Sequence, residues 1–110
     1  MYILGIESSC DESAASVLKA SGQKTEILSN VIASQINIHA QYGGVIPEIA
    51  AREHVLHILP TIDSALKQAK ITHKDIKALA VTQGPGLITS LIAGVESAKA
   101  LSLIWKKPLI

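Results

Sequence analysis

The chain opens, at residues 2–18, with the sequence YILGIESSCDESAASVL, and this stretch decides how the following residues fold. It contains two apolar runs, Ile3 to Ile6 and Ala14 to Leu18, and short apolar runs between turn signals are typical of buried strands. Polar or small residues at positions 7–12 separate the two runs. We therefore expect two strands, about 2–7 and 14–19, that pair as an antiparallel hairpin.

The polar loop between these strands carries most of the chemistry in this stretch. Glu7 and Asp11 supply carboxylates, Ser8 and Ser9 supply hydroxyls, and Cys10 supplies a thiol. Loops at strand ends commonly carry function, because a rigid sheet positions them. Hydroxyls and backbone N–H groups can hold phosphate oxygens, and a carboxylate can hold a water or metal ion bound to them. The alternative, a polar hairpin turn without a function, stays open at this point.

The remaining sequence predicts a third strand, followed by two helices that alternate with two further strands. In chain order we expect a turn at 20–24, a strand at 25–36, a loop at 35–44, a helix at 45–70, a strand at 78–81, a helix at 87–106 and a strand that begins near Pro108. Three strands joined by short turns should form an antiparallel meander. The order β-β-β-α-β-α-β predicts an α/β fold, a mixed sheet with helices packed on it.

Side-chain patterns add expectations for three of these elements. In the third strand, Ile27 and Val31 should face one way and Leu28 the other. Pro60 lies inside the first long helix and should kink it or split it in two. The second long helix is apolar nearly all round, which predicts burial on two sides, against the sheet and against a second body.

A second candidate site is the sequence TQGPG at residues 82–86, between a predicted strand and a predicted helix. Glycine lets the backbone approach a ligand closely, and a helix start offers free N–H groups to an anion. The pattern is neither a P-loop nor GxGxxG, so a tight structural turn is the alternative. If strands 2–7 and 78–81 are neighbours, their carboxyl ends place both candidate sites at one rim of the sheet.

Size and composition restrict the class of protein. The chain has 110 residues, 48% of them hydrophobic and 17% charged, which fits one small domain or one lobe of a larger protein. The formal net charge of +1 gives no broad footprint for nucleic acid, so contact with RNA would be local or through partners. A single cysteine fits a reducing, cytoplasmic compartment. Residues 87–105 are long enough to cross a membrane, but Glu96 and Lys99 within them argue against a membrane role.

The histidines and the cysteine are weaker candidates for a site. His54 and His57 follow Glu53 in the order Glu-His-x-x-His, which differs from the zinc motif His-Glu-x-x-His, and we interpret them as structural or surface residues. His39 lies beside a Tyr-Gly-Gly sequence, and we favour a structural loop there too. Cys10 has acidic neighbours that should raise its pKa, so we do not expect it to act as a nucleophile.

Three blocks of sequence closely resemble the TsaD family. They are GIESSCDESA at 5–14, QINIHAQYGGVIPEIAAREH at 35–54 and VTQGPGLI at 81–88. Members of this family are tRNA N6-adenosine threonylcarbamoyltransferases, formerly called O-sialoglycoprotein endopeptidases or glycoproteases. The resemblance implies the fold of actin, Hsp70 and sugar kinases, in which two lobes enclose a cleft. Residues 1–110 would then be the first lobe, truncated where the strand near Pro108 begins.

The resemblance also implies a reaction and a site. The full-length enzyme would transfer a threonylcarbamoyl group from threonylcarbamoyl-adenylate to the adenosine beside the tRNA anticodon, and the fragment alone would be inactive. Asp11 would be catalytic, orienting or deprotonating the attacking amine. The residues expected to line the adenylate cleft are Glu7, Ser8, Ser9, Gly84, Pro85 and Gly86. One divalent metal or iron is implied for the full-length protein, held by a His-x-x-x-His pair that lies beyond Ile110, and no metal ligand is expected in this fragment.

The expected partners are tRNA, the adenylate and a TsaB-like paralogue with other subunits, bound through the helices at 45–70 and 87–105. The fragment could also self-associate through those helices, and no membrane partner is expected. Two alternatives stay open, a metal-dependent glycoprotease and a non-catalytic partner-binding module of the TsaB type.

Overall fold

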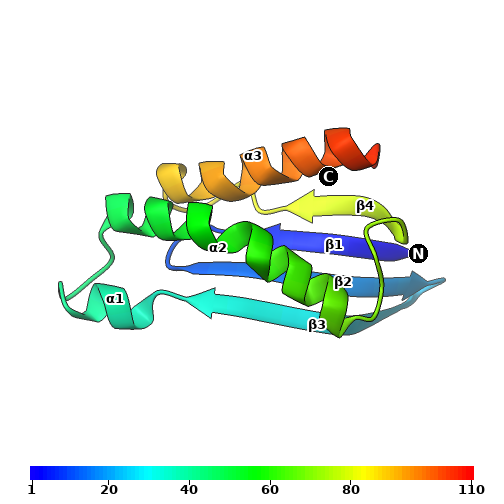
Figure 1. Ribbon diagram of the computed structural model, residues 1–110, viewed down its shortest axis with the longest axis horizontal. Coiled ribbons are helices and arrows are strands. Elements are labelled where there is room, and N and C mark those ends of the chain that lie inside the picture. The colour runs from blue at the N-terminus through cyan, green and yellow to red at the C-terminus, as the bar shows by residue number, and fades with distance from the viewer.

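Alternation of buried and exposed side chains builds a sheet that two long helices cover on one face, as the computed structural model of residues 1–110 shows (Figure 1). In chain order the elements are β1 (Tyr2–Glu7), β2 (Glu12–Ser21), β3 (Lys24–Ser34), α1 (Ile36–Ala40), α2 (Pro47–Gln68), β4 (Ile76–Val81) and α3 (Ile88–Trp105). The N-terminus lies at the end of the molecule where β1 and β4 begin, whereas the C-terminus runs back along β4, where the Val81 N–H donates to the Ile110 carbonyl at 3.1 Å (Figure 1).

The sheet is mixed, with the strand order β3-β2-β1-β4. The pairs β1–β2 and β2–β3 are antiparallel, which confirms the predicted meander, and β1 pairs with β4 in parallel. Leu109 forms a parallel bridge with Leu79 on the outer side of β4, where the N–H of Ile110 donates to the Leu79 carbonyl at 2.8 Å. The residues after Pro108 therefore begin to pair as a further strand, as the sequence predicts.

The hydrophobic core lies between one face of the sheet and the helices. Leu4 and Ile6 from β1 and Val17 from β2 point into it and are almost completely buried. The complete buried cluster is Leu4, Ile6, Ala15, Val17, Ile58, Ile62, Ala65, Ile76, Leu79 and Ala98. Because the strands alternate, the next residues along each of them lie on the opposite face of the sheet, which no helix covers.

The first correction concerns residues 35–44, which the sequence predicts as a loop. They contain the short helix α1, whose Gln35 carbonyl accepts the N–H groups of Ile38 and His39. The sequence does not predict this helix because the segment is polar. Its buried residue is His39, and it has no buried apolar face. Pro60 does not split α2, which is continuous and bends along its length (Figure 1).

The second correction concerns the facing of residues in β3. The pairing with β2 shifts register between Val17 and Leu18, where Leu28 is the extra residue of a bulge. Leu28 and Val31 therefore both pack against the core, whereas Ile27 is 67% exposed. The prediction that Ile27 shares a face with Val31 is wrong, because simple alternation takes no account of a bulge.

The outer surfaces of the two long helices stay apolar. We define the outer helical face as Val55, Leu56, Leu59, Ile88, Ile92 and Leu103, all of them exposed. By length and composition α3 could cross a membrane, but such a helix is weak support for a span, and here it packs against α2 and β4. The exposed apolar side chains of α3 agree with the expectation that the sheet buries only one side of this helix.

Candidate functional site

The two candidate segments meet at one rim of the sheet, as the sequence predicts. Because β1 and β4 are parallel neighbours, the loop after β1 and the turn after β4 begin side by side. The N–H of Leu87 donates to the Ser9 carbonyl at 2.8 Å. Gly86 packs against the same residue so closely that an added Cβ would lie 2.6 Å from the Ser9 oxygen. Glycine is therefore required at this contact.

Ser8 joins the loop to the interior of α3. Its Oγ donates to the Ser90 carbonyl at 2.7 Å and accepts the Gly94 N–H at 2.9 Å, so it lies between two groups of the helix backbone. Ser8 is 1% exposed, and its hydroxyl is committed to these bonds. The expectation that Ser8 lines a ligand cleft stays a prediction, because Ser8 is buried in this structure.

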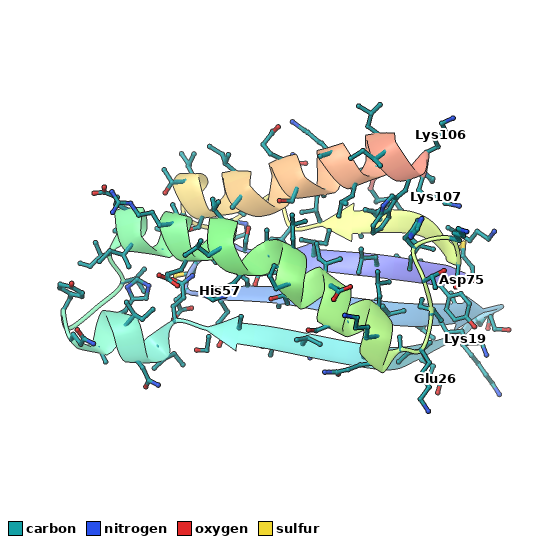
Figure 2. The ribbon with its side chains drawn as sticks, in the orientation of Figure 1. Lys19, Glu26, His57, Asp75, Lys106 and Lys107 are labelled. Carbon is teal, nitrogen blue, oxygen red and sulfur yellow. The ribbon has the colours of Figure 1, made fainter.

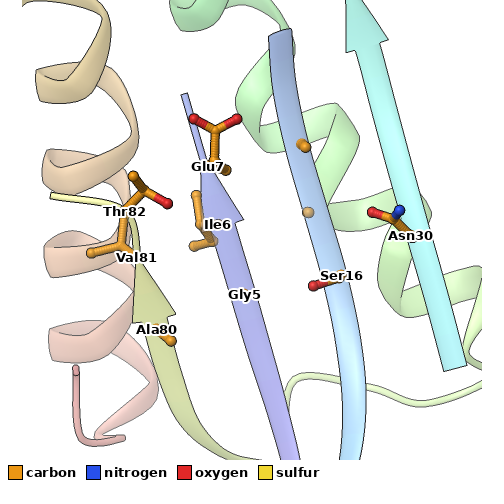
Figure 3. A pocket seen from close by; sticks show the side chains of 10 residues that line it. Gly5, Ile6, Glu7, Ser16, Asn30, Ala80, Val81 and Thr82 are labelled. Atoms are coloured by element: carbon orange, nitrogen blue, oxygen red, sulfur yellow. The ribbon is translucent and has the colours of Figure 1, made fainter. Parts of the chain in front are cut away.

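The carboxylates at the rim lie in different surroundings. Glu7 accepts the N–H of Ser9 with its own carboxylate and lines a pocket of about 370 Å³ on the uncovered face of the sheet (Figure 3). Asp11 is half-buried, and its carboxylate has no hydrogen-bond partner within the chain. It is therefore free to bind something else.

The turn 82–86 leads into a helix start that suits an anion. Leu87 is the N-cap of α3, and the first turn of the helix contains no acidic residue that would occupy its free N–H groups. Thr82 lines the pocket beside Glu7 (Figure 3). Phosphate oxygens at this helix start would lie next to the carboxylates of the β1–β2 loop, within one rim.

Two buried histidines support the loop from the core side. His54 is completely buried, with Nδ1 2.7 Å from the Ser13 Oγ and Nε2 2.9 Å from the Cys10 carbonyl. His39 Nε2 lies 2.7 Å from Gln35 Oε1, and the N–H of Gln35 donates to the Asp11 carbonyl at 2.9 Å. His57, by contrast, forms a surface pair with Glu53 at 3.0 Å. The sequence signalled these histidines only as structural candidates.

The Cys10 thiol is poorly suited to nucleophilic chemistry. Burial raises its pKa above the ordinary value, and the negative charges of Asp11 and Glu7 raise the pKa further. Little of the thiol is thiolate at neutral pH, and the thiolate is the reactive form. The acidic neighbours act as the sequence predicts, and burial is the larger cause.

The chain's own residues do not form a metal site. No three side chains of His, Cys, Asp or Glu come together in residues 1–110. The two buried histidines use both ring nitrogens in hydrogen bonds within the protein. The metal implied by the family resemblance stays a prediction about residues beyond this chain.

The sequence alone missed the residues that line the uncovered face of the sheet. Gly5, Ser16 and Asn30 lie there on three adjacent strands, together with Thr82 at the end of β4 (Figure 3). An added Cβ at Gly5 would lie 3.0 Å from Ser16 Oγ, so the floor of the pocket is built from small residues. In the sequence these pocket residues alternate with the core residues along each strand. The alternation identifies the pocket face only when the face covered by the helices is known.

Comparison with known proteins shows which family the sequence matches. The family model described as TsaD, tRNA N6-adenosine threonylcarbamoyltransferase, matches residues 26–110. Two curated relatives with that name, from Thermomicrobium roseum and Bacillus subtilis, are 53% and 54% identical over 110 residues. The alignments cover 100% of this chain but only 29% and 31% of those relatives, so the chain spans about a third of their length.

Solved structures with low sequence identity share the fold. YeaZ from Pseudomonas aeruginosa superposes with a TM-score of 0.72 at 17% identity, which covers 100% of this chain and 43% of that one. Thermus thermophilus RuvC superposes with a TM-score of 0.56 at 12% identity, which covers 99% of this chain and 61% of that one. These matches confirm the predicted fold class, an actin-like α/β lobe.

Proposed function

The chain belongs to the TsaD family, and on this premise we propose that it is the first lobe of a tRNA threonylcarbamoyltransferase. The observation that carries the proposal is the meeting of the β1–β2 loop and the turn 82–86 at one rim, joined by the Leu87–Ser9 hydrogen bond of 2.8 Å. This rim combines the unpartnered carboxylate of Asp11 with the N–H groups of a helix start. An acyl-adenylate needs both, because an amine must be positioned and a phosphate stabilised.

In the proposed reaction, the amine nitrogen of a tRNA adenosine attacks the carbamoyl carbon of threonylcarbamoyl-adenylate. The carbon–nitrogen bond forms while the bond from that carbon to the phosphate oxygen breaks, AMP leaves with the electron pair, and the amine loses one proton. The unpartnered carboxylate of Asp11 would orient the amine or accept that proton. The backbone of Gly84 to Gly86 and the start of α3 would hold the phosphate.

Replacing Asp11 by asparagine tests this assignment, because the change removes the charge and keeps the shape. In the full-length enzyme with its partner proteins, Asp11→Asn should lower the rate of threonylcarbamoyl transfer to tRNA by about 100-fold, the usual scale for a lost acid–base group. Mass spectrometry of digested tRNA measures the product. Asp63→Asn makes the same change at an exposed position of α2 and should keep the wild-type rate.

Normal turnover by Asp11→Asn would contradict the role given to Asp11. A wild-type enzyme that leaves tRNA unmodified and cleaves a sialoglycoprotein would instead favour the glycoprotease alternative. A protein without either activity that still binds its paralogue would favour the non-catalytic module.

Contact with tRNA is supported by the way charge is distributed along the molecule. The end at which β1 begins and α3 ends carries unpaired lysines, which we call the lysine end: Lys19, Lys24, Lys70, Lys74, Lys77, Lys106 and Lys107. Figure 2 shows Lys19, Lys106 and Lys107 there, with Glu26 and Asp75 as the opposing charges. The ion pairs of the structure involve other basic residues, Arg52, His57, Lys67 and Lys99. The net charge of +1 therefore conceals a basic end and an acidic rim.

We propose that the lysine end contacts the phosphate backbone of tRNA while the modified adenosine reaches the rim. The molecule is 45 Å long, so the lysine end and the rim would contact separate parts of one tRNA. Lys74→Glu with Lys106→Glu should weaken tRNA binding by the full-length enzyme and lower the slope of log affinity against log salt concentration by roughly 1 per lost phosphate contact. Lys74→Arg with Lys106→Arg keeps the charge and should bind as wild type.

Filter binding across a salt series measures both quantities. Unchanged affinity and slope in the glutamate variant would contradict the placement of tRNA. Loss of a protein partner with normal tRNA binding would assign the lysine end to an acidic protein surface.

The outer helical face is the proposed docking surface for a TsaB-like paralogue. Exposed apolar side chains on two neighbouring helices are the usual mark of a protein interface. The same surface could pair two copies of the fragment. We place this assembly in the cytoplasm, where a lone cysteine stays reduced.

A further inference from the structure

The segment that carries Asp11 is anchored from the core side by one imidazole. His54 is 0% exposed, and its Nε2 lies 2.9 Å from the Cys10 carbonyl, which can only accept. Nε2 therefore carries the hydrogen, and Nδ1 accepts from the Ser13 hydroxyl at 2.7 Å. Cys10 and Ser13 flank Asp11 and Glu12, so a single side chain of α2 holds both ends of the turn.

A second arm holds the peptide group between these two anchors. The N–H of Gln35 donates to the Asp11 carbonyl at 2.9 Å. The Gln35 side chain is itself fixed, because His39 Nε2 donates to its Oε1 at 2.7 Å and its Nε2 donates to the Ala50 carbonyl at 3.3 Å. Gln35 and His39 are 2% and 3% exposed, so water does not compete for these hydrogen bonds.

The segment around Asp11 is thus held by the carbonyls of Cys10 and Asp11 and by the Ser13 hydroxyl, whereas the Asp11 carboxylate is left without a partner. A catalytic group performs best when its own position is set by residues behind it and its reactive atoms stay free. From this arrangement we propose that His54 is a positioning residue, which aims the Asp11 carboxylate through the Cys10 carbonyl. The inference rests on the proposed function for the role of Asp11, and on hydrogen bonds alone for the role of His54.

A matched pair of amide variants separates positioning from simple packing. Glutamine places its side-chain N–H about where Nε2 of histidine lies and can still donate to the Cys10 carbonyl, whereas asparagine is one methylene shorter and cannot reach it. In the full-length enzyme with its partners, His54→Asn should lower kcat on the order of 10- to 100-fold, because small misplacements of a catalytic group have effects of this size. His54→Gln should recover most of kcat. The KM for tRNA should stay close to wild type in both, because the lysine end is unchanged.

His57→Ala is the control, since His57 lies three residues further along the same helix but pairs at the surface with Glu53. It should keep the wild-type kcat. Alkylation of Cys10, read by peptide mass spectrometry, gives a second readout that needs no activity. The rate should rise several-fold in His54→Asn, as the loop loosens and the thiol loses its burial, and should stay unchanged in His54→Gln and His57→Ala.

Equal kcat values and equal Cys10 alkylation rates in the asparagine and glutamine variants would overturn the inference. If His54→Asn does not fold, the test rests on His54→Gln alone. A folded His54→Gln enzyme that has lost 10-fold or more in kcat would then overturn the inference. A wild-type enzyme without transferase activity would refute the proposed function, and the alkylation rates would then still decide whether His54 holds the loop.

Discussion

Replacing Gly94 by alanine should destabilise the fold by about 1–3 kcal/mol, the usual cost of overpacking a tightly packed site. The added Cβ would lie 2.5 Å from Ser8 Oγ. This oxygen cannot move aside without breaking its bonds to the Ser90 carbonyl and the Gly94 N–H. The clash outweighs the gain of up to about 1 kcal/mol that alanine brings to a helix interior. Urea unfolding followed by circular dichroism measures the difference.

Gly84→Ala is the matched control, because nothing lies within 4 Å of a Cβ added there. Its free energy of unfolding should stay within about 0.5 kcal/mol of wild type. Removing the Ser8 hydroxyl should make the Gly94 substitution less costly, so the two changes should not add in the double variant Ser8→Ala/Gly94→Ala. Strict additivity, or a Gly94→Ala protein as stable as wild type, would show that Ser8 does not insert into α3.

Charge on the outer helical face should weaken assembly with the paralogue by about 30-fold or more. Ile92 and Leu103 are 52% and 81% exposed on the same side of α3, and Ile92→Glu with Leu103→Glu would force two carboxylates into an apolar contact. Losing the central contacts of an interface typically costs at least about 2 kcal/mol, which corresponds to that factor. Calorimetric titration of the full-length protein with the paralogue measures the affinity.

The control for this prediction is Ile27→Glu, on β3. Ile27 is 67% exposed, so its replacement introduces the same charge at a comparably open position away from the helices. The affinity of this variant should be that of wild type. Similar losses in both proteins would assign the interface to another surface, and an unchanged affinity of the α3 variant would remove it from α3.

The shared rim could be predicted because it depends only on strand order. Parallel neighbours place their carboxyl ends together, so an apolar run before Glu7 and another before Thr82 were sufficient to bring the two segments side by side. The convergence was therefore readable from the sequence, and the hydrogen bond from Leu87 to Ser9 adds the detail that the turn packs directly on the loop.

What the sequence could not reveal depends on contacts between distant residues. The spacing of Leu56 and Leu59 suggests a core face on α2, yet both are exposed, and the polar His54 and Thr61 are buried instead. For His54 that choice follows from hydrogen bonds to Cys10 and Ser13, which lie more than 40 residues away in the chain. The burial of Ser8 could not be predicted for the same reason. A serine in a polar loop gives no local sign that its hydroxyl will bond to the backbone of a distant helix.

The bulge at Leu28 has a consequence for how copies of this chain meet. β3 is the outermost strand on its side of the sheet, and a flat outer strand offers free backbone groups to any other chain. The extra residue bends β3 and increases its twist, and the exposed Lys24 and Glu26 place charges along this edge. Strand-to-strand growth into larger aggregates is disfavoured there, which leaves recognition of partners to side chains on the helices.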